Sequence, residues 1–411
     1  MRFVIFPAGL VVITLLLYQV PPIHQRLSWR VEIAMTYVRG VFEPAGKLPT
    51  ALPPPAVRVT VHPTTTPINK PTIAPDTPVS SPTPTIPAAT PTPLPGSALL
   101  PAPKWEKQGP NNCGPATLTM YLRYYGWKGT QDDIASLVKP LIEDRNVNAD
   151  ELIYFSRTQV GWLNAEFRVG GNIKILKTFL AAGIPVMIEE GMLLDKAYWP
   201  KDDLWAGHYL LFNGYDEISQ VFIAQDSFRG ADQEVSYENL EENWQAFNFV
   251  YILIYRPDAT AIVQSILQDN LDADINRQNA LELAQAETAD NPKNAFAWFN
   301  LGSNLVYFER YAEAGRAYDS ARALGLPQRM LRYQFGPFFA YFFGNRNTDL
   351  LALTEYALKI TPDSEETMLW RGWGLYRDGK KSEAIEFFNK ALKANPNYQD
   401  AVYAIDYVEN N

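Results

Sequence analysis

The stretch Gln108-Gly-Pro-Asn-Asn-Cys113-Gly-Pro115-Ala-Thr-Leu118 contains the only cysteine among the 411 residues of the chain. A proline two residues after the thiol is suited to be the first residue of a helix, because its missing N–H would have no partner there. The apolar stripe that follows at helical spacing consists of Leu118, Tyr121, Leu122 and Tyr125. We therefore expect a helix that starts here, with Cys113 at its N-terminus.

A thiol in this position has the surroundings of a nucleophile. The unpaired N–H groups and the macrodipole of a helix N-terminus favour an anion and lower the pKa of a thiol. Gly114 lets a substrate approach the backbone closely, and the side-chain amide of Gln108 can add a donor to an oxyanion hole. The alternatives are a cysteine buried as a small apolar residue and a surface role for Gln108.

A nucleophilic thiol needs a base, and His208 is the only histidine in a part of the chain that we expect to fold. If its strand and the next one form a hairpin centred near Glu217, Asp226 lies directly opposite the histidine. A carboxylate there holds the imidazole tautomer that withdraws the thiol proton. Asn213 and Asp216 are rival candidates for the orienting group.

The acidic and aromatic segment Glu189–Trp205 comes shortly before this histidine and carries Tyr198 and Trp199. We interpret it as a wall or lid of the substrate cleft. The alternative is a surface loop whose aromatic residues pack on the edge of the domain.

Residues 104–257 combine a helical beginning with later runs typical of strands. These runs are Ile184–Ile188, His208–Asn213, Val221–Ala224 and Phe249–Tyr255. Helices followed by strands predict an α+β domain.

Residues 258–411 are helical in pattern and repetitive. Prolines recur at positions 292, 327, 362 and 396. The small and aromatic residues Gly302, Ala314, Tyr318 and Ala321 reappear as Gly372, Ala384, Phe388 and Ala391. This pattern resembles the tetratricopeptide (TPR) repeat, whose period is about 34 residues. We expect an all-α array of three repeats with flanking helices over 262–411, whose concave face binds a protein partner. The alternative is that the repeats only pack against the preceding domain.

The N-terminal part has two further segments. Residues 3–20 are uncharged and almost wholly apolar, which predicts a transmembrane anchor within 1–22, or alternatively a cleaved signal sequence. Residues 23–103 form a juxtamembrane segment and a stalk. Seventeen of the 32 prolines and eleven threonines lie in 49–103, which predicts a disordered, extended Pro/Thr-rich spacer.

Composition excludes several classes of function. The net charge is −9 and basic residues form no sizeable run, so binding to nucleic acid is not expected. One cysteine and three histidines exclude a disulfide framework and a Cys/His zinc site. The sequence contains no ligand cluster and no glycine-rich phosphate loop, so we expect neither a metal nor an organic cofactor.

The motifs Asn111-Asn-Cys-Gly-Pro-Ala-Thr-Leu, Tyr124-Tyr-Gly, Gly207-His-Tyr and Gln225-Asp-Ser resemble the bacteriocin-processing (double-glycine leader) cysteine peptidase family over about 104–257. The resemblance implies a papain-like fold with no cofactor. It also implies a role for each of four residues: Cys113 as nucleophile, His208 as general base and acid, Asp226 as orienter and Gln108 as oxyanion donor.

Two features depart from that family. The chain carries no transporter, so processing of leader peptides is not implied. Ser227 stands where a proline is common, which weakens the assignment of Asp226.

Together these features predict a membrane-anchored, extracytoplasmic cysteine peptidase that acts on a peptide or protein substrate, with TPR repeats that recruit a substrate or partner. A transpeptidase or acyltransferase using the same thiol is one alternative. A catalytically inactive adhesion or scaffold protein is the other.

Overall fold

The computed structural model describes residues 18, 20–44, 46, 48–52 and 93–411. The predicted membrane anchor lies almost wholly outside these residues, and so does the part of the predicted stalk at 53–92. Within the described part of the chain, no helix has both the length and the apolar character needed to cross a membrane.

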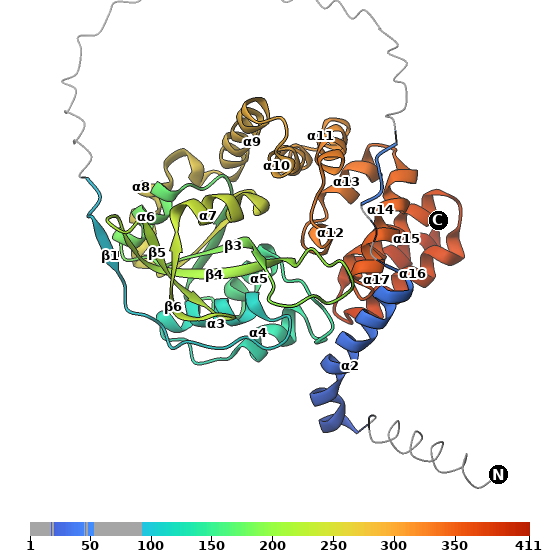
Figure 1. The fold of residues 1–411 in the computed structure, drawn as a ribbon, viewed down its shortest axis with the longest axis horizontal. Coiled ribbons are helices and arrows are strands. Elements are labelled where there is room, and N and C mark those ends of the chain that lie inside the picture. The colour runs from blue at the N-terminus through green and yellow to red at the C-terminus, as the bar shows by residue number, and fades with distance from the viewer. Residues whose placement is uncertain (1–17, 19, 45, 47, 53–92) are drawn as a thin grey trace, which may run out of the picture.

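Among the described residues, seven strands form one antiparallel sheet in the order β2-β7-β3-β4-β5-β6, and β1 pairs with the end of β4 (Figure 1). The strands are β1 (Ser97–Leu99), β2 (Asn164–Arg168), β3 (Val186–Leu193), β4 (Trp205–Asp216), β5 (Val221–Asp226), β6 (Gly230–Ser236) and β7 (Tyr251–Tyr255). Four of them, β3, β4, β5 and β7, overlap the runs that the sequence predicted. The short β1 and the more polar β2 and β6 were not predicted.

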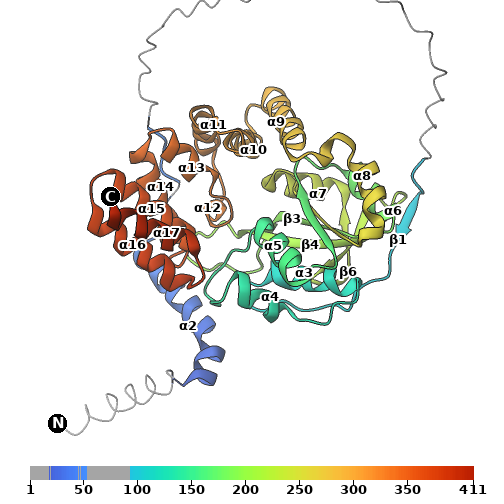
Figure 2. The same ribbon diagram turned by 180° about the vertical axis from the view of Figure 1, so that it is seen from behind.

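Helices cover both faces of this sheet, so the module has three layers (Figures 1 and 2). One face is covered by α3 (Cys113–Tyr124), α4 (Gln131–Val138) and α5 (Ala149–Gln159). The other face is covered by α6 (Ile173–Ala181), α7 (Tyr237–Trp244) and α8 (Thr260–Leu267). Short 3₁₀ helices lie at η1 (Gln245–Phe247), η2 (Pro257–Ala259) and η3 (Gln268–Leu271).

Alternation along β4 explains how one strand serves both cores. Leu210 and Phe212 pack with the α6–α8 layer, whereas Tyr209 and Leu211 pack with the α3–α5 layer. Successive side chains of a strand point to opposite faces, so a central strand that is buried on both sides is apolar throughout. The expected combination of a sheet with helices is confirmed.

The sheet module extends beyond the predicted range of 104–257 at both ends. Strand β1 belongs to the segment assigned to the stalk, yet Ala98 pairs with Tyr215 of β4. Helix α8 was grouped with the repeats, but its Val263 and Leu267 are buried in the core of the sheet module. Ala98 of β1 packs against the same core as Val263 and Leu267, so both elements belong to the sheet module.

The C-terminal part is an array of helices. They are α9 (Ala273–Asp290), α10 (Ala295–Tyr307), α11 (Tyr311–Leu324), α12 (Met330–Tyr333), α13 (Gly336–Phe343), α14 (Asn347–Ile360), α15 (Glu365–Arg377), α16 (Lys381–Ala394) and α17 (Gln399–Asn410). Three helix pairs, α10–α11, α13–α14 and α15–α16, correspond to the three predicted repeats.

Close packing within the pairs explains the recurring glycines. A Cβ atom added at Gly302 would lie 2.7 Å from the ring of Tyr318, and one added at Gly372 would lie 2.3 Å from Phe388. Both distances are far below a normal contact, so the aromatic ring of the second helix fills the space that the glycine leaves. The periodic pattern therefore reflects helix-to-helix contact, as the sequence predicted.

The repeats are docked against the sheet module. Val169, Phe247 and Ala280 form one hydrophobic cluster with Tyr333 at its edge. Asn276 of α9 exchanges two hydrogen bonds with the backbone of Val169, at 3.0 and 2.9 Å. This contact brings the repeats next to the start of β4.

Part of the predicted juxtamembrane segment is ordered, in contrast to the disorder expected for the stalk. Residues Pro21–Phe42 form helix α2, which lies alongside the repeats in both views (Figures 1 and 2). Glu32 of this helix forms an ion pair with Arg145 of the sheet module. Farther on, the carbonyl oxygen of Pro49 accepts a hydrogen bond from Arg322 at 3.0 Å. This segment is held by contacts with residues that are distant in the sequence. The periodicity of the sequence does not reveal such contacts.

Candidate functional site

The loop before α3 is fixed by one glutamine. The Oε1 atom of Gln131 accepts hydrogen bonds from the backbone N–H of Gly109 and from the side chain of Asn112, both at 2.7 Å. The Nε2 atom of Gln131 donates to Glu106 at 2.9 Å. These bonds hold the chain in one path up to the residue that caps α3, and they fix the direction in which the helix starts.

Helix α3 begins at Cys113, with Asn112 as its N-cap, so the thiol lies at a helix N-terminus as predicted. Pro115 is the third helical residue, not the first, because helical backbone already starts at Cys113. Leu118 and Tyr121 are fully buried, which confirms the apolar stripe. The helix is anchored on β4 by a hydrogen bond from Thr117 to the carbonyl oxygen of Tyr209 at 3.2 Å.

His208 lies near the beginning of β4, where it is 3% exposed and faces Glu190 of β3 in the antiparallel register. Its Nε2 atom lies 2.8 Å from Oδ1 of Asp226. An ionised carboxylate only accepts hydrogen bonds, so Nε2 donates and the other ring nitrogen, Nδ1, remains for Cys113. The sequence-predicted histidine and aspartate are therefore brought together.

The predicted strand register was wrong, although the two side chains meet. Asp226 faces Leu210, and the register shifts between Phe212 and Gly214. Asp216 pairs with Val221, so the hairpin is centred after Glu217, between Ile218 and Ser219, and the bulge removes only one residue of the resulting offset. Asp226 reaches His208 as a diagonal neighbour two residues away, a distance that long side chains span.

The carboxylate of Asp226 is well held. Its Oδ1 atom also accepts the backbone N–H groups of Phe228 at 2.7 Å and of Arg229 at 3.0 Å. Burial alone would raise the pKa of Asp226, but the hydrogen bond and the charge of His208 outweigh burial and lower it. The group is thus ionised at neutral pH.

The two rival orienters have other partners. Asn213 is buried and bonds to the carbonyl oxygen of Leu100 and to Gln225. The Oδ1 atom of Asp216 accepts two backbone N–H groups in the turn after β4, at Ile218 and Ser219. Neither has a hydrogen bond with His208.

Gln108 lines the same cavity as Cys113. Its Oε1 atom accepts a hydrogen bond from the hydroxyl group of Ser227 at 2.9 Å, and its backbone N–H donates to the carbonyl oxygen of Ser227 at 2.9 Å. With Oε1 engaged, the NH₂ group is the end of the amide that can donate to a ligand. Ser227, which the sequence marked only as a departure, therefore orients Gln108.

The thiol and the imidazole form a charged pair. Burial alone would raise the pKa of Cys113, but the hydrogen bond and charge of His208, followed by the charge of Lys139, lower it below its ordinary value. Burial alone would lower the pKa of His208, but hydrogen bonds to Asp226 and Cys113 raise it to about 10. Both shifts favour the thiolate and imidazolium form of the pair over the neutral thiol and imidazole.

Sequence reasoning missed three ionisable groups next to this pair. Lys139 is buried, and its Nζ atom donates to the carbonyl oxygens of Asn111 at 2.9 Å and of Asp144 at 2.5 Å. Burial raises the pKa of Glu190 to about 7, and it raises the pKa of Glu189 well above its ordinary value. Both glutamates lie in a strand that is otherwise apolar. Two acidic residues inside an apolar run are the only sign of them in the sequence.

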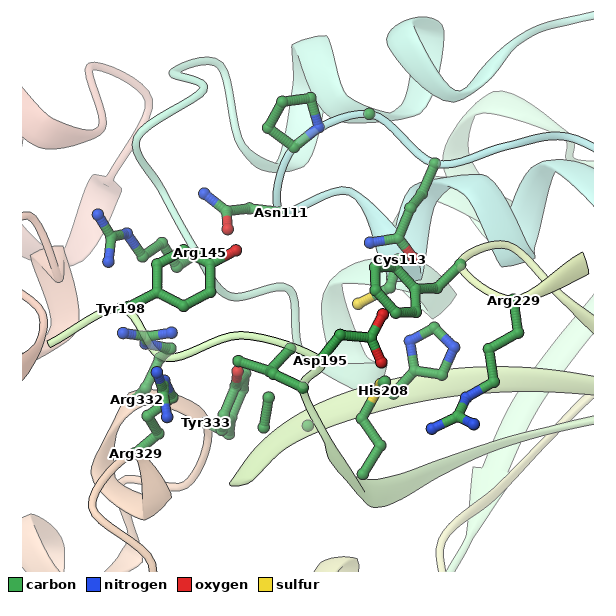
Figure 3. A pocket seen from close by; sticks show the side chains of 18 of the residues that line it. Asn111, Cys113, Arg145, Asp195, Tyr198, His208, Arg229, Arg329, Arg332 and Tyr333 are labelled. Atoms are coloured by element: carbon green, nitrogen blue, oxygen red, sulfur yellow. The ribbon is translucent and has the colours of Figure 1, made fainter. Parts of the chain in front are cut away.

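A cavity of about 760 Å³ opens beside Cys113 and His208 (Figure 3). The loop between β3 and β4 forms one wall through Tyr198 and Trp199, the position expected for the segment Glu189–Trp205. Glu189 itself lies inside strand β3, so only the part after Leu193 is a loop.

The repeats form the adjoining part of this wall through Arg329, Arg332 and Tyr333 (Figure 3). No residue pattern in the sequence indicates that the repeats reach the site. A Cβ atom at Gly207 would lie 3.2 Å from the ring of Tyr333, so the residue before His208 packs directly against the array. The cavity is therefore built from both modules.

Comparison with known families agrees with this division. Residues 100–252 match the Peptidase_C39 like family, and residues 365–398 match the tetratricopeptide repeat. The chain thus contains a C39-like domain followed by a helical region with a TPR repeat.

Individual proteins are only distantly similar. A structure described as a C39-like peptidase from Bacillus anthracis is 18% identical, covers 39% of this chain and 98% of its own, and has a TM-score of 0.31. A double glycine motif protease from an AMS/PCAT transporter, solved with a leader peptide, is 16% identical, covers 39% of this chain and 94% of its own, and has a TM-score of 0.29. Protein arginine N-methyltransferase 9 from Homo sapiens is 42% identical over 57 residues, which are 14% of this chain and 7% of that protein.

Proposed function

We propose that the chain is a cysteine peptidase in which Cys113 attacks a peptide carbonyl, with the papain-like pairing of a helix-borne thiol and a strand-borne histidine. The observation that carries the proposal is the buried contact of 2.8 Å between His208 and Asp226 beside a thiol of lowered pKa. A histidine that is oriented on one side by a carboxylate and bonded on the other to a thiol has the geometry of an activated nucleophile.

The reaction proceeds in two steps. The Sγ atom of Cys113 bonds to the carbonyl carbon, and the tetrahedral oxyanion accepts hydrogen bonds from the N-terminal N–H groups of α3 and from the NH₂ group of Gln108. His208 gives its Nδ1 proton to the leaving amine as the C–N bond breaks. Water, deprotonated by His208, then cleaves the thioester, which releases the acid and restores the Cys113 thiolate and the His208 imidazolium.

Asp226 acts through His208. The carboxylate stabilises the imidazolium and fixes the ring so that Nδ1 faces the sulfur. Ser227 acts one step farther away, through Gln108. Neither residue touches the substrate in this scheme, and both are positioning residues.

The test uses the full chain and a pooled library of synthetic peptides, with products identified by mass spectrometry. Wild-type protein is expected to cut a subset of the peptides. Cys113→Ala and His208→Ala are each expected to lose this activity by a factor of about 100 or more. Ser136→Ala, which removes an exposed hydroxyl group on α4, is the control and retains activity. Undiminished cleavage by Cys113→Ala would contradict the proposal.

The same experiment distinguishes transfer from hydrolysis. When an added amine such as glycine amide intercepts the acyl-enzyme, products gain its mass in place of water. We propose hydrolysis as the main outcome, because the cavity is open beside Cys113 and admits water.

We also propose that the protein is held at a membrane with its C39-like domain outside the cytoplasm. This proposal is supported by the apolar, uncharged segment at 3–20 and by the Pro/Thr-rich segment that follows it. Digestion of intact cells with an added protease tests it: loss of the domain supports the proposal, and protection until lysis contradicts it.

A further inference from the structure

The wall of the cavity that the repeats provide is strongly basic. Arg329 and Arg332 of the repeats and Arg145 of the sheet module gather at the end away from Cys113 and His208 (Figure 3). The chain as a whole has a net charge of −9, so composition does not explain three guanidinium groups in one wall. Asp195 lies between this wall and His208 (Figure 3).

Two of the three arginines are paired with carboxylates of the chain. Arg329 makes two hydrogen bonds of 2.5 Å with Asp202, and its guanidinium lies 4.0 Å from the centre of the Trp199 ring. Arg145 forms an ion pair with Glu32 of α2. Their positive charges are largely balanced, and they serve to hold the loop and α2 in place.

Arg332 has a different environment. It is 8% exposed, and its Nε and Nη2 atoms donate to Oγ1 of Thr361 at 2.9 Å and to the carbonyl oxygen of Ile360 at 3.5 Å. Within the described part of the chain, no carboxylate lies at ion-pairing distance from it. Its acceptors are the C-terminal end of α14, whose dipole offers only about half of an elementary negative charge.

The surroundings of Arg332 favour an added anion. Burial, together with the nearby charges of Arg145 and Arg329, outweighs the raising effect of Tyr333 and lowers the pKa of Arg332 to about 9. A buried cation without a counter-charge is costly, and a bound carboxylate would remove that cost. The contacts with α14 hold the guanidinium in one place, so a ligand need not order it.

We propose that Arg332 is the centre of a carboxylate-binding subsite, which selects peptides that carry an acidic group away from the bond attacked by Cys113. The inference rests on the proposed peptidase function and adds a substrate class to it. A guanidinium binds a carboxylate through two parallel hydrogen bonds, with a planar match that no neutral group offers. Asp195 repels an anion from the nearer part of the cavity and so favours the far end.

Either an acidic side chain or the C-terminal carboxylate of a peptide supplies this chemistry. Three pools of acetylated random octapeptides without acidic residues at the varied positions separate the two sources. The first has one fixed Glu and an amidated C-terminus, the second has Gln in place of Glu and is amidated, and the third has Gln and a free C-terminus.

Occupancy of the cavity is measured as protection of Cys113 from iodoacetamide, with initial alkylation rates followed by mass spectrometry. Cys113 is the only cysteine, so the label reports this site alone. In the wild-type full chain, we expect the Glu pool, the free-acid pool or both to protect at concentrations at least about tenfold lower than the neutral pool, as one charge-assisted interaction gives. Equal protection by all three pools would overturn the inference without any variant.

Variants then assign the preference to one residue. Arg332→Gln is expected to make the three pools equivalent, and Arg332→Lys is expected to keep part of the preference. Lys107→Gln is the matched control, because Lys107 also lines the cavity but is exposed. A preference that survives in a folded Arg332→Gln protein, judged by an unchanged melting temperature, would overturn the inference.

The outcome is separate from that of the proposed function. If the carboxylate pools protect Cys113 but no peptide is cut, the subsite stands and the peptidase proposal fails. If peptides are cut with no preference for a carboxylate, the peptidase proposal stands and the subsite fails.

Discussion

Arg329 of the repeats and Asp202 of the β3–β4 loop form a bidentate ion pair, with both hydrogen bonds at 2.5 Å and the arginine 1% exposed. Gln328, the preceding residue, also accepts a hydrogen bond from the indole N–H of Trp199 at 2.8 Å. These hydrogen bonds hold the β3–β4 loop, which lines the cavity, against the repeats. We therefore expect the two modules to unfold together.

Asp202→Asn should destabilise the protein strongly, because it removes the bidentate partner of the buried Arg329 guanidinium and leaves only the more distant carboxylate of Asp203, at 3.6 Å. The expected loss in the free energy of unfolding is about 3–5 kcal/mol, measured by urea denaturation. The control is Glu313→Gln, which breaks an exposed pair with Arg310 and should change stability by less than about 1 kcal/mol. Similar small effects for both variants would show that the modules are not coupled through this pair.

Gln108→Ala should lower kcat by a factor of about 100, with little change in KM, because an oxyanion donor acts mainly in the transition state. Ser227→Ala should lower kcat less, since the amide remains but loses the hydrogen bond that orients it. Ser227→Thr keeps a hydroxyl group and should restore most of the activity. If KM rises and kcat does not fall in Gln108→Ala, Gln108 binds the ground state instead.

Asp226→Asn should lower kcat/KM by a factor of about 100 or more, because an amide no longer stabilises the imidazolium or fixes its tautomer. The alkaline limb of the pH profile should move as well. In the wild type, kcat/KM should fall above about pH 10, where His208 loses its proton. Without the carboxylate the imidazolium loses its proton at lower pH, so the limb should move downward. If the alkaline limb does not move in Asp226→Asn, Asp226 does not control the pKa of His208.

Gly372→Ala should destabilise the repeats, because its new Cβ atom would lie 2.3 Å from the ring of Phe388. We expect a loss of about 1–3 kcal/mol, as for other overpacked cores, measured by thermal unfolding. The control is Gly96→Ala, where a Cβ atom would have no neighbour within 4 Å. Equal melting temperatures of the two variants would contradict the packing described for the repeat.

Local signals explain why much of the site could be predicted from the sequence. The Cys-Gly-Pro turn and the stripe after it mark a helix N-terminus, and His208 stands out because folded histidines are so few. Asp226 was predicted for an incorrect reason, since the hairpin is centred after Glu217, Asp226 faces Leu210, and a diagonal contact makes the pair with His208.

Contacts between the modules had no local signal. Arg332 reads as an ordinary surface residue of a helical repeat, and only the docking of the repeats on the sheet turns it toward the cavity. The same holds for α2, whose pairing of Glu32 with Arg145 joins residues more than a hundred positions apart. Periodicity describes an element and its buried face, whereas the partner of that face follows from the tertiary fold.

The rate of Cys113 alkylation by iodoacetamide as a function of pH, in the wild type and in His208→Ala, tests the central claim most directly. The thiolate is the reactive form, so the midpoint of the profile reports the pKa of the thiol. We predict a wild-type midpoint clearly below about 8.5, the ordinary value, because His208 stabilises the thiolate. We predict a rise of the midpoint in His208→Ala, where burial acts without the imidazolium. An ordinary midpoint near 8.5 in the wild type, unchanged by the loss of His208, would contradict an activated thiol.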